Sequence, residues 1–312
     1  MILGHTKQQA MFKRLATTGR LSHAYIFSGI DGIGKRTFAM ELARGLLCSD
    51  GKFFEPCDCP MCKLVLRDQQ ESDTRRVERE ADKKGENKGK KLRFCPDLYL
   101  LDEPDDLRIE SIRDIIGDLS VSSYGNDWRV VVLDNAHDMG VEAANAFLKT
   151  LEEPSGETLF MLVSSQPDRL LPTIRSRCLN LDFEPLDKNT LLMVLRKVKI
   201  NVNEVLLDYA GGSVSRIQLL RQLDFTGLKA SIDTNSIEGL AKSIFSADSL
   251  DKLADVLAVL LPCYMSRYKS TLDVRYVSLV SYLETMVQTL KTNVNLNLAS
   301  LGIFTKIAET LK

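Results

Sequence analysis

The hydrophobic and polar positions in the middle of the chain follow the pattern of a parallel α/β unit. The run Arg129–Asp134 holds four consecutive apolar residues and ends on a carboxylate. A helix is predicted over Val141–Glu152, because its apolar residues recur at helical spacing, and Pro154 ends it. A second apolar strand follows over Thr158–Val163. Strand, helix and strand with short connections predict a parallel sheet, and such folds place metal and phosphate chemistry at the carboxyl ends of the strands.

A glycine-rich loop lies between a predicted strand and a predicted helix near the N-terminus. The buried strand Ala24–Phe27 runs into the loop Ser28–Thr37, whose notable residues are Gly29, Gly32, Gly34 and Lys35. This order is the context of a P-loop, in which glycines let the backbone wrap around phosphate. The lysine would reach the β- and γ-phosphates, and the helix N-terminus adds its dipole.

One position departs from a working P-loop. The residue after the lysine should be Ser or Thr, to bind Mg²⁺, but Arg36 stands there and Thr37 follows one place late. Arginine has no acceptor atom for a metal, and a one-residue shift on a helix turns the side chain by about 100°. We therefore expect either a loop that binds phosphate, as ATP or ADP, without hydrolysing it, or a glycine loop kept for packing alone.

Three segments resemble a known family. They are Asn145–Pro154 (NAFLKTLEEP), Ser165–Pro167 (SQP) and Leu171–Cys178 (LPTIRSRC). These segments are similar to the clamp-loader branch of the AAA+ ATPases. The resemblance is strong over residues 1–225 and weaker, mostly architectural, over 226–312.

The resemblance implies three domains. The first, over residues 1–184, is an α/β AAA+ P-loop domain with a parallel sheet. The second, over 185–226, is a small helical lid domain. The third, over 227–312, is an all-α C-terminal collar domain that serves oligomerisation.

The resemblance also assigns roles to single residues. In the AAA+ pattern Asp134 would help to hold Mg²⁺, and the next residue would be a Glu that polarises water, but Asn135 cannot take a proton. Together with Arg36, this substitution argues against ATP turnover by the chain itself. Arg177, in a Ser-Arg-Cys motif, is implied to be an arginine finger for a neighbouring subunit's ATP site, and the alternative is a structural arginine paired with an acidic residue. Arg216 stands at the position of a second sensor arginine. It would either bind phosphate or serve packing.

Four of the seven cysteines cluster, with eight, one and two residues between them: Cys48, Cys57, Cys59 and Cys62. In a cytosolic chain such clustering indicates a metal before disulfides. Four thiolates can close a tetrahedral zinc shell, which leaves no open position for catalysis. The resembling family has a structural zinc module here, one residue longer between the second and third cysteines. Zinc is the expectation, and reduced cysteines without a ligand are the alternative. Cys95 and Cys178 are interpreted as packing residues.

Residues 68–93 form a charged run with almost no apolar side chains to bury. The run predicts a solvated helix that gives way to a disordered loop, and relative to the resembling family it is an insertion. Its lysine-rich end is either solvated or in contact with DNA phosphates.

Length, composition and charge limit the class of protein and the partners it could have. A chain of 312 residues with 44% hydrophobic residues is typical of a soluble protein of two or three domains. The net charge of −1 argues against a dominant basic surface for nucleic acid. No apolar run approaches the ~18 residues that span a membrane, and the N-terminus has no signal-peptide pattern. A cytoplasmic location with no membrane partner is therefore expected.

The resemblance implies a subunit of the DNA polymerase III clamp loader. With gamma/tau and delta subunits it would load the sliding clamp onto primed DNA during replication, and Arg177 would act in trans. One alternative is a catalytically active gamma-type clamp-loader ATPase. Another is a stand-alone nucleic-acid-binding AAA+ module that joins no ring.

Overall fold

The computed structural model describes residues 2–81, 93–120, 128–202, 204–223, 225–290 and 294–311. The chain divides into two compact units, Met1–Val194 and Leu195–Lys312. The finer domain boundaries expected near residues 184 and 226 stay predictions.

The first unit alternates helices and strands. Its elements are α1 (Thr6–Thr17), β1 (Ala24–Ser28), α2 (Lys35–Leu46), α3 (Pro60–Ala81), β2 (Leu98–Leu101), η1 (Pro104–Leu107), α4 (Ile109–Leu119), β3 (Trp128–Leu133), η2 (Ala136–Asp138), α5 (Val141–Glu152), β4 (Glu157–Ser164), η3 (Pro167–Arg169), α6 (Pro172–Arg175) and β5 (Leu179–Asp182), where η marks a short 3₁₀ helix.

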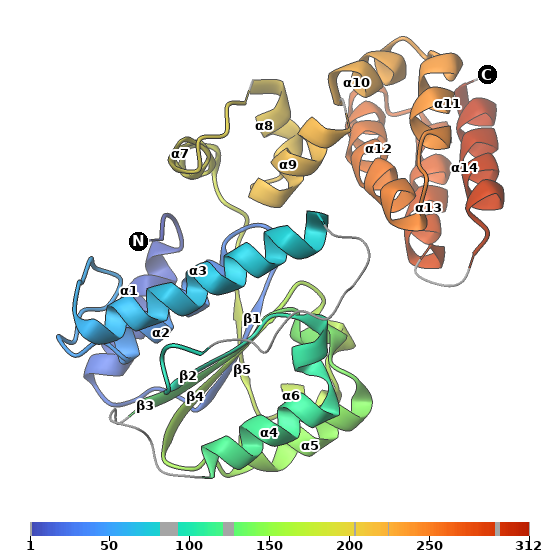
Figure 1. Cartoon of the computed structure of the whole chain (residues 1–312). Coiled ribbons are helices and arrows are strands. Elements are labelled where there is room, and N and C mark those ends of the chain that lie inside the picture. The colour runs from blue at the N-terminus through green and yellow to red at the C-terminus, as the bar shows by residue number, and fades with distance from the viewer. Residues whose placement is uncertain are drawn as a thin grey trace. The chain divides into compact units, whose positions relative to one another are not determined.

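The described strands form one parallel sheet in the order β2-β3-β4-β1-β5. Helices α1, α2 and α3 cover one face and α4, α5 and α6 cover the other (Figure 1). Successive residues of β3 therefore enter different cores: Val130 and Val132 pack toward the first set of helices, and Val131 and Leu133 toward the second. Burial of both faces explains why this strand is an unbroken apolar run.

The regular elements of the second unit are all helices in the part of the chain that the structure describes. Helix α7 (Lys188–Lys197) crosses the boundary between the units, and it is followed by α8 (Glu204–Ala210), α9 (Val214–Gln222), α10 (Phe225–Asp233), α11 (Ile237–Phe245), α12 (Leu250–Thr271), α13 (Val274–Thr289) and α14 (Leu296–Leu311). One hydrophobic cluster joins side chains from α8 through α14. The predicted fold class, a parallel-sheet α/β P-loop unit followed by a helical C-terminal region, is confirmed.

Helix α3 corrects the prediction for the charged run. Residues 68–81 continue this helix, and residues 82–92 lie outside the described residues. The helix is not simply solvated, because Asp68 is buried and its carboxylate accepts the backbone N–H groups of Phe94 and Cys95, both at 2.8 Å. Polar side chains that find hydrogen-bond partners can be buried, and composition does not reveal such partners.

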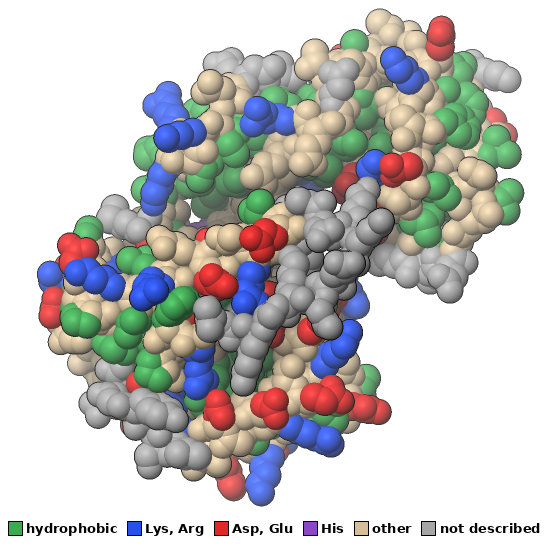
Figure 2. All heavy atoms as spheres, viewed as in Figure 1, with side chains coloured by type: hydrophobic (Ala, Val, Ile, Leu, Met, Phe, Trp, Pro, Cys, Tyr) green, Lys and Arg blue, Asp and Glu red, His purple; other side chains and the backbone are tan. Residues whose placement is uncertain are grey.

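Charge is mixed over the visible surface. In Figure 2, Lys and Arg side chains of the first unit are interspersed with Asp and Glu rather than gathered into one basic area. Within the described ranges, no helix is both long enough and apolar enough to cross a membrane.

Candidate functional site

The carboxyl ends of parallel strands meet at one edge of the sheet, and this edge gathers polar side chains. Asp102 directly follows β2 and Asp134 directly follows the neighbouring β3. The backbone N–H of Asp134 donates to the carbonyl of Leu101 at 2.8 Å, which ties the two strand ends together. Both carboxylates are buried. The loop after β1 reaches the same edge, as expected for ligand sites in such sheets.

That loop has the backbone of a P-loop. Gly29, Gly32 and Gly34 have φ angles of 140°, 74° and 96°, which favour glycine. A Cβ on Gly29 would lie 2.5 Å from the carbonyl oxygen of Phe183. Lys35 Nζ donates to the carbonyls of Gly29 and Ile30, both at 2.7 Å, so the lysine lies inside the curve of the loop. Burial lowers the pKa of this amine from its ordinary value.

A cluster of arginines and carboxylates, which includes the buried Asp102 and Asp134, lies beside the P-loop. Arg36 Nη2 donates to Asp102 Oδ2 at 3.0 Å, and Arg36 Nη1 donates to Asp73 Oδ1 on α3 at 2.7 Å. Arg76, one turn further along α3, donates from Nη1 to Asp134 Oδ2 at 3.0 Å. Arg36 Nε lies 3.7 Å from the same oxygen. Two helices thus direct guanidinium groups at the two strand-end carboxylates.

Ser72 completes this cluster. Its hydroxyl accepts a hydrogen bond from Arg36 Nη2 at 2.6 Å and donates to the Asp102 carboxylate. The carboxylate oxygens that a divalent cation would need are therefore already engaged by protein donors.

Thr37 and Asn135 lie at the two positions where the sequence departs from the ATPase pattern. Thr37 is exposed and forms no side-chain bond within the described cluster. Asn135 has a left-handed backbone (φ 51°), and its N–H donates to Asp134 Oδ1 at 3.1 Å. An amide at this position supplies no general base.

Arg177 lies elsewhere on the unit, just after α6. Its Nε donates to Glu152 Oε1 at 2.7 Å, and its Nη2 donates to the same oxygen. Its Nη1 donates to the carbonyl of Thr173 at 2.9 Å and to the hydroxyl of Ser176 at 3.2 Å. The side chain is 32% exposed, compared with 14% for Arg36 and 34% for Arg76 in the P-loop cluster.

Comparison with known proteins places the chain in a family. Residues 4–187 match the family described as DNA polymerase III, delta subunit. DNA polymerase III subunit delta' of Pseudomonas aeruginosa is 31% identical over 257 residues, which cover 80% of this chain and 69% of that protein. This chain belongs to the delta' family of DNA polymerase III subunits.

Two further comparisons extend this result. DNA polymerase III subunit tau of Salmonella typhimurium is 33% identical over 170 residues, which cover 54% of this chain and 23% of that protein. A solved structure of a DNA polymerase III gamma subunit-related protein from Thermotoga maritima superposes with a TM-score of 0.52 and 17% identity, over 98% of this chain and 100% of that one. At this identity the superposition supports the fold alone.

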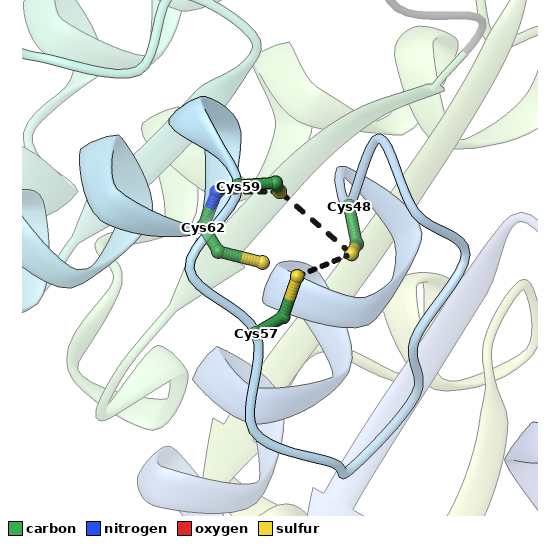
Figure 3. A group of neighbouring side chains, drawn as sticks. All are labelled: Cys48, Cys57, Cys59 and Cys62. Atoms are coloured by element: carbon green, nitrogen blue, oxygen red, sulfur yellow. Dashed lines mark hydrogen bonds between the residues drawn. The ribbon is translucent and has the colours of Figure 1, made fainter.

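The four clustered cysteines converge as a metal site requires. Cys48 follows α2, Cys62 lies in the first turn of α3, and Cys57 and Cys59 come from the loop between these helices. All four sulfur atoms lie within 4.8 Å of one another and point toward a common centre (Figure 3). Cys48 Sγ is 3.5 Å from Cys57 Sγ and 3.9 Å from Cys59 Sγ. Zinc–sulfur bonds of about 2.3 Å in a tetrahedron place sulfurs about 3.8 Å apart.

Donors around these sulfurs favour a thiolate at Cys59, whereas burial and the neighbouring thiols raise the pKa of Cys62. The backbone N–H groups of Lys52 and Cys62 donate to Cys48 Sγ and Cys59 Sγ, each at 3.5 Å, and Arg44 Nη1 lies 3.8 Å from Cys62 Sγ. Burial alone raises a thiol pKa, but backbone N–H donors outweigh it at Cys59 and lower the pKa to about 6. The cluster can therefore bind a metal ion, and the short Cys57–Cys59 spacing does not prevent the sulfurs from converging.

The other cysteines of the first unit are of a different kind. Cys95 and Cys178 are buried, and burial raises their pKa values to about 11 and about 12. Such thiols stay protonated and unreactive near neutral pH, in keeping with packing roles.

Arg216 has an internal partner in the second unit. It lies on α9, and its Nη2 donates to the backbone carbonyl of Ala258 on α12. In an unbroken helix that carbonyl would accept the N–H of residue 262, but Pro262 has none. Arg216 thus satisfies an acceptor that the proline leaves without its helical partner.

Sequence reasoning missed Asp102, Ser72, Arg76 and Glu152. A signal for Asp102 was present, because it follows the apolar run Leu98–Leu101 just as Asp134 follows β3. The α3 residues share one helix face by their three- and four-residue spacing, but nothing local indicates what that face contacts.

Proposed function

We propose that this chain is the delta' subunit of a clamp loader and that it contributes to ATP hydrolysis only in a neighbour's site. With gamma/tau and delta subunits it loads the sliding clamp onto primed DNA. Arg177 is the arginine finger, and its guanidinium stabilises charge on the phosphates of the adjoining subunit. The supporting observation is a contrast within one unit: Arg36 and Arg76 engage the buried carboxylates that Mg²⁺ would need, whereas Arg177 pairs with Glu152, a carboxylate that is half exposed.

The proposal assigns the cysteine cluster to a structural zinc ion. Cys48, Cys57, Cys59 and Cys62 would hold it, and the ion would cross-link the end of α2 to the start of α3. It has no catalytic part, because four thiolates leave no position for water. The P-loop remains open to ATP or ADP binding, and hydrolysis there is not expected.

A gamma-type ATPase is the second candidate. The intact glycine backbone and the position of Lys35 favour it. Arg36 and Asn135 count against it, because the first removes a metal ligand and the second a general base.

The test is the ATPase activity of the gamma–delta–delta' assembly with clamp and primed DNA. Arg177→Ala should lower turnover by about tenfold or more, since fingers in other systems contribute ~10³-fold or more. Arg175→Ala is the matched control, because this arginine is also exposed, lies two residues away, and pairs with Asp168 at 3.0 Å. Assembly of the ring is checked by size-exclusion chromatography.

Two outcomes would contradict the proposal. If Arg177→Ala matches the wild type in an intact ring, the arginine does not act in trans. If the isolated chain hydrolyses ATP as fast as the assembly, the gamma-type ATPase replaces the proposal.

A further inference from the structure

The guanidinium of Arg177 is held on several sides. An arginine has five N–H donors. Here Nε and one Nη2 donor bind Glu152, and Nη1 binds Thr173 and Ser176, so four of the five are engaged. Thr173 and Ser176 belong to the same segment as Arg177, whereas Glu152 is the last residue of α5 and fixes the side chain from outside that segment.

The pair of Arg177 with Glu152 lies partly in solvent. The side chains of Arg177 and Glu152 are 32% and 47% exposed, and exposed ion pairs contribute little to the free energy of unfolding. Both donors meet a single oxygen of Glu152, whereas a phosphate group offers a guanidinium two oxygens and more charge. Glu152 can therefore hold the arginine in the free subunit. A phosphate can then take its place as the partner of Arg177 with little loss of free energy.

Holding the arginine matters because its side chain is long and flexible. A free arginine loses considerable rotamer entropy when it is fixed on a ligand, and less is lost if it is already fixed. Glu152 lies on α5, a helix packed into the core through Phe147 and Leu151. The hydrogen bonds to the Glu152 carboxylate thus tie the Arg177 side chain to a rigid helix of the fold.

Resting on the function proposed above, we propose that Glu152 is a positioning residue for Arg177. It holds the guanidinium extended at the surface in the free subunit. It then exchanges with the phosphates of a nucleoside triphosphate bound by the neighbouring subunit.

The first arm of the test uses the isolated full-length chain and needs no partner. The Nε–Hε signal of Arg177 is followed by NMR in the wild type and in Glu152→Ala. The expected result is a lower heteronuclear NOE and faster exchange with water in the variant. Glu153→Ala is the matched control, because it removes an exposed carboxylate at the adjacent position. An unchanged Arg177 signal in Glu152→Ala overturns the proposal.

The second arm measures ATP hydrolysis by the assembly with clamp and primed DNA. Glu152→Ala should lower kcat about three- to tenfold with little change in KM for ATP, because misplacement of a catalytic group affects mainly the transition state. Glu152→Gln keeps an acceptor oxygen and should recover at least half of the wild-type kcat. Glu153→Ala should match the wild type.

The Arg177→Ala background separates the two proposals. There, Glu152→Ala should have no further effect, and a further loss would overturn the positioning role. If Arg177→Ala lowers turnover but Glu152→Ala does not, only the role of Glu152 fails. If Arg177→Ala itself has no effect, both the proposed function and this role fail.

Discussion

Two regions of the first unit join arginines to carboxylates, in opposite surroundings. Beside the P-loop, the side chains of Arg36, Asp102 and Asp134 are 14%, 1% and 7% exposed. At the other region, Arg177 and Glu152 are about one third and one half exposed. Residue types and bond lengths are similar in the two regions, so burial makes the difference.

Burial decides whether a guanidinium can leave its partner. Breaking a buried ion pair by removing one member costs about 3–5 kcal/mol, because the other charge stays desolvated. An exposed pair contributes about 0–1 kcal/mol. The pair of Arg36 with Asp102 is thus a permanent part of the fold, whereas the pair of Arg177 with Glu152 costs little to break. The same chemical group is held by a buried carboxylate in one region and by an exposed carboxylate in the other.

The largest predicted effect is a loss of thermal stability when the metal is removed, and we expect it to arise in the P-loop region. The cysteine cluster joins the end of α2, which begins with Lys35 and Arg36, to the start of α3, which carries Arg76. Chelation or Cys62→Ser should lower Tm by about 10 °C or more, because structural zinc contributes several kcal/mol to folding. Thermal unfolding and zinc content by mass spectrometry measure this together.

The zinc measurement has an internal control. Cys263→Ala removes a buried cysteine of the second unit and should leave the zinc content unchanged. Re-added zinc should restore Tm after chelation. If the purified chain holds no zinc and Cys62→Ser has the same Tm as the wild type, the cysteines are reduced and without a ligand.

The next effect compares the two regions directly. Arg36→Met should lower the free energy of unfolding by about 2–4 kcal/mol, since Asp102 stays buried with one charged partner fewer. Arg177→Met should lower it by less than about 1 kcal/mol. Urea denaturation of both variants, followed by circular dichroism, gives the two values. Equal losses would mean that burial does not separate these regions as argued.

Local patterns were enough to predict the frame of the molecule. The strand over Val130–Leu133, the P-loop backbone and the convergence of four cysteines all rest on residues close in sequence, where periodicity and turn chemistry act. The prediction that Lys35 reaches phosphate stays a prediction, and in the structure its amine donates to the carbonyls of Gly29 and Ile30.

Contacts between distant residues could not be predicted in the same way. Arg36 donates hydrogen bonds to Ser72 and Asp102, which are 36 and 66 residues away. The charged residues around Ser72 had predicted that this segment is exposed to solvent. The sequence identified Arg36 as unfit for Mg²⁺ but not which carboxylates it would engage. That outcome depends on how α3 packs against α2, which is a tertiary property.

Arg216 extends the comparison to a third arginine and gives the smallest predicted effect. Arg216→Met should cost about 1–2 kcal/mol, because the Ala258 carbonyl loses its donor. In a Pro262→Ala background the N–H of residue 262 becomes available to that carbonyl, so the same substitution should cost about 1 kcal/mol less. Urea denaturation of the four proteins of this double-mutant cycle measures the coupling. Equal cost in both backgrounds would show that Arg216 is held for another reason, and a phosphate-binding role would then regain support. A clear coupling would place Arg216 with Arg36, as an arginine whose partners are internal to the fold.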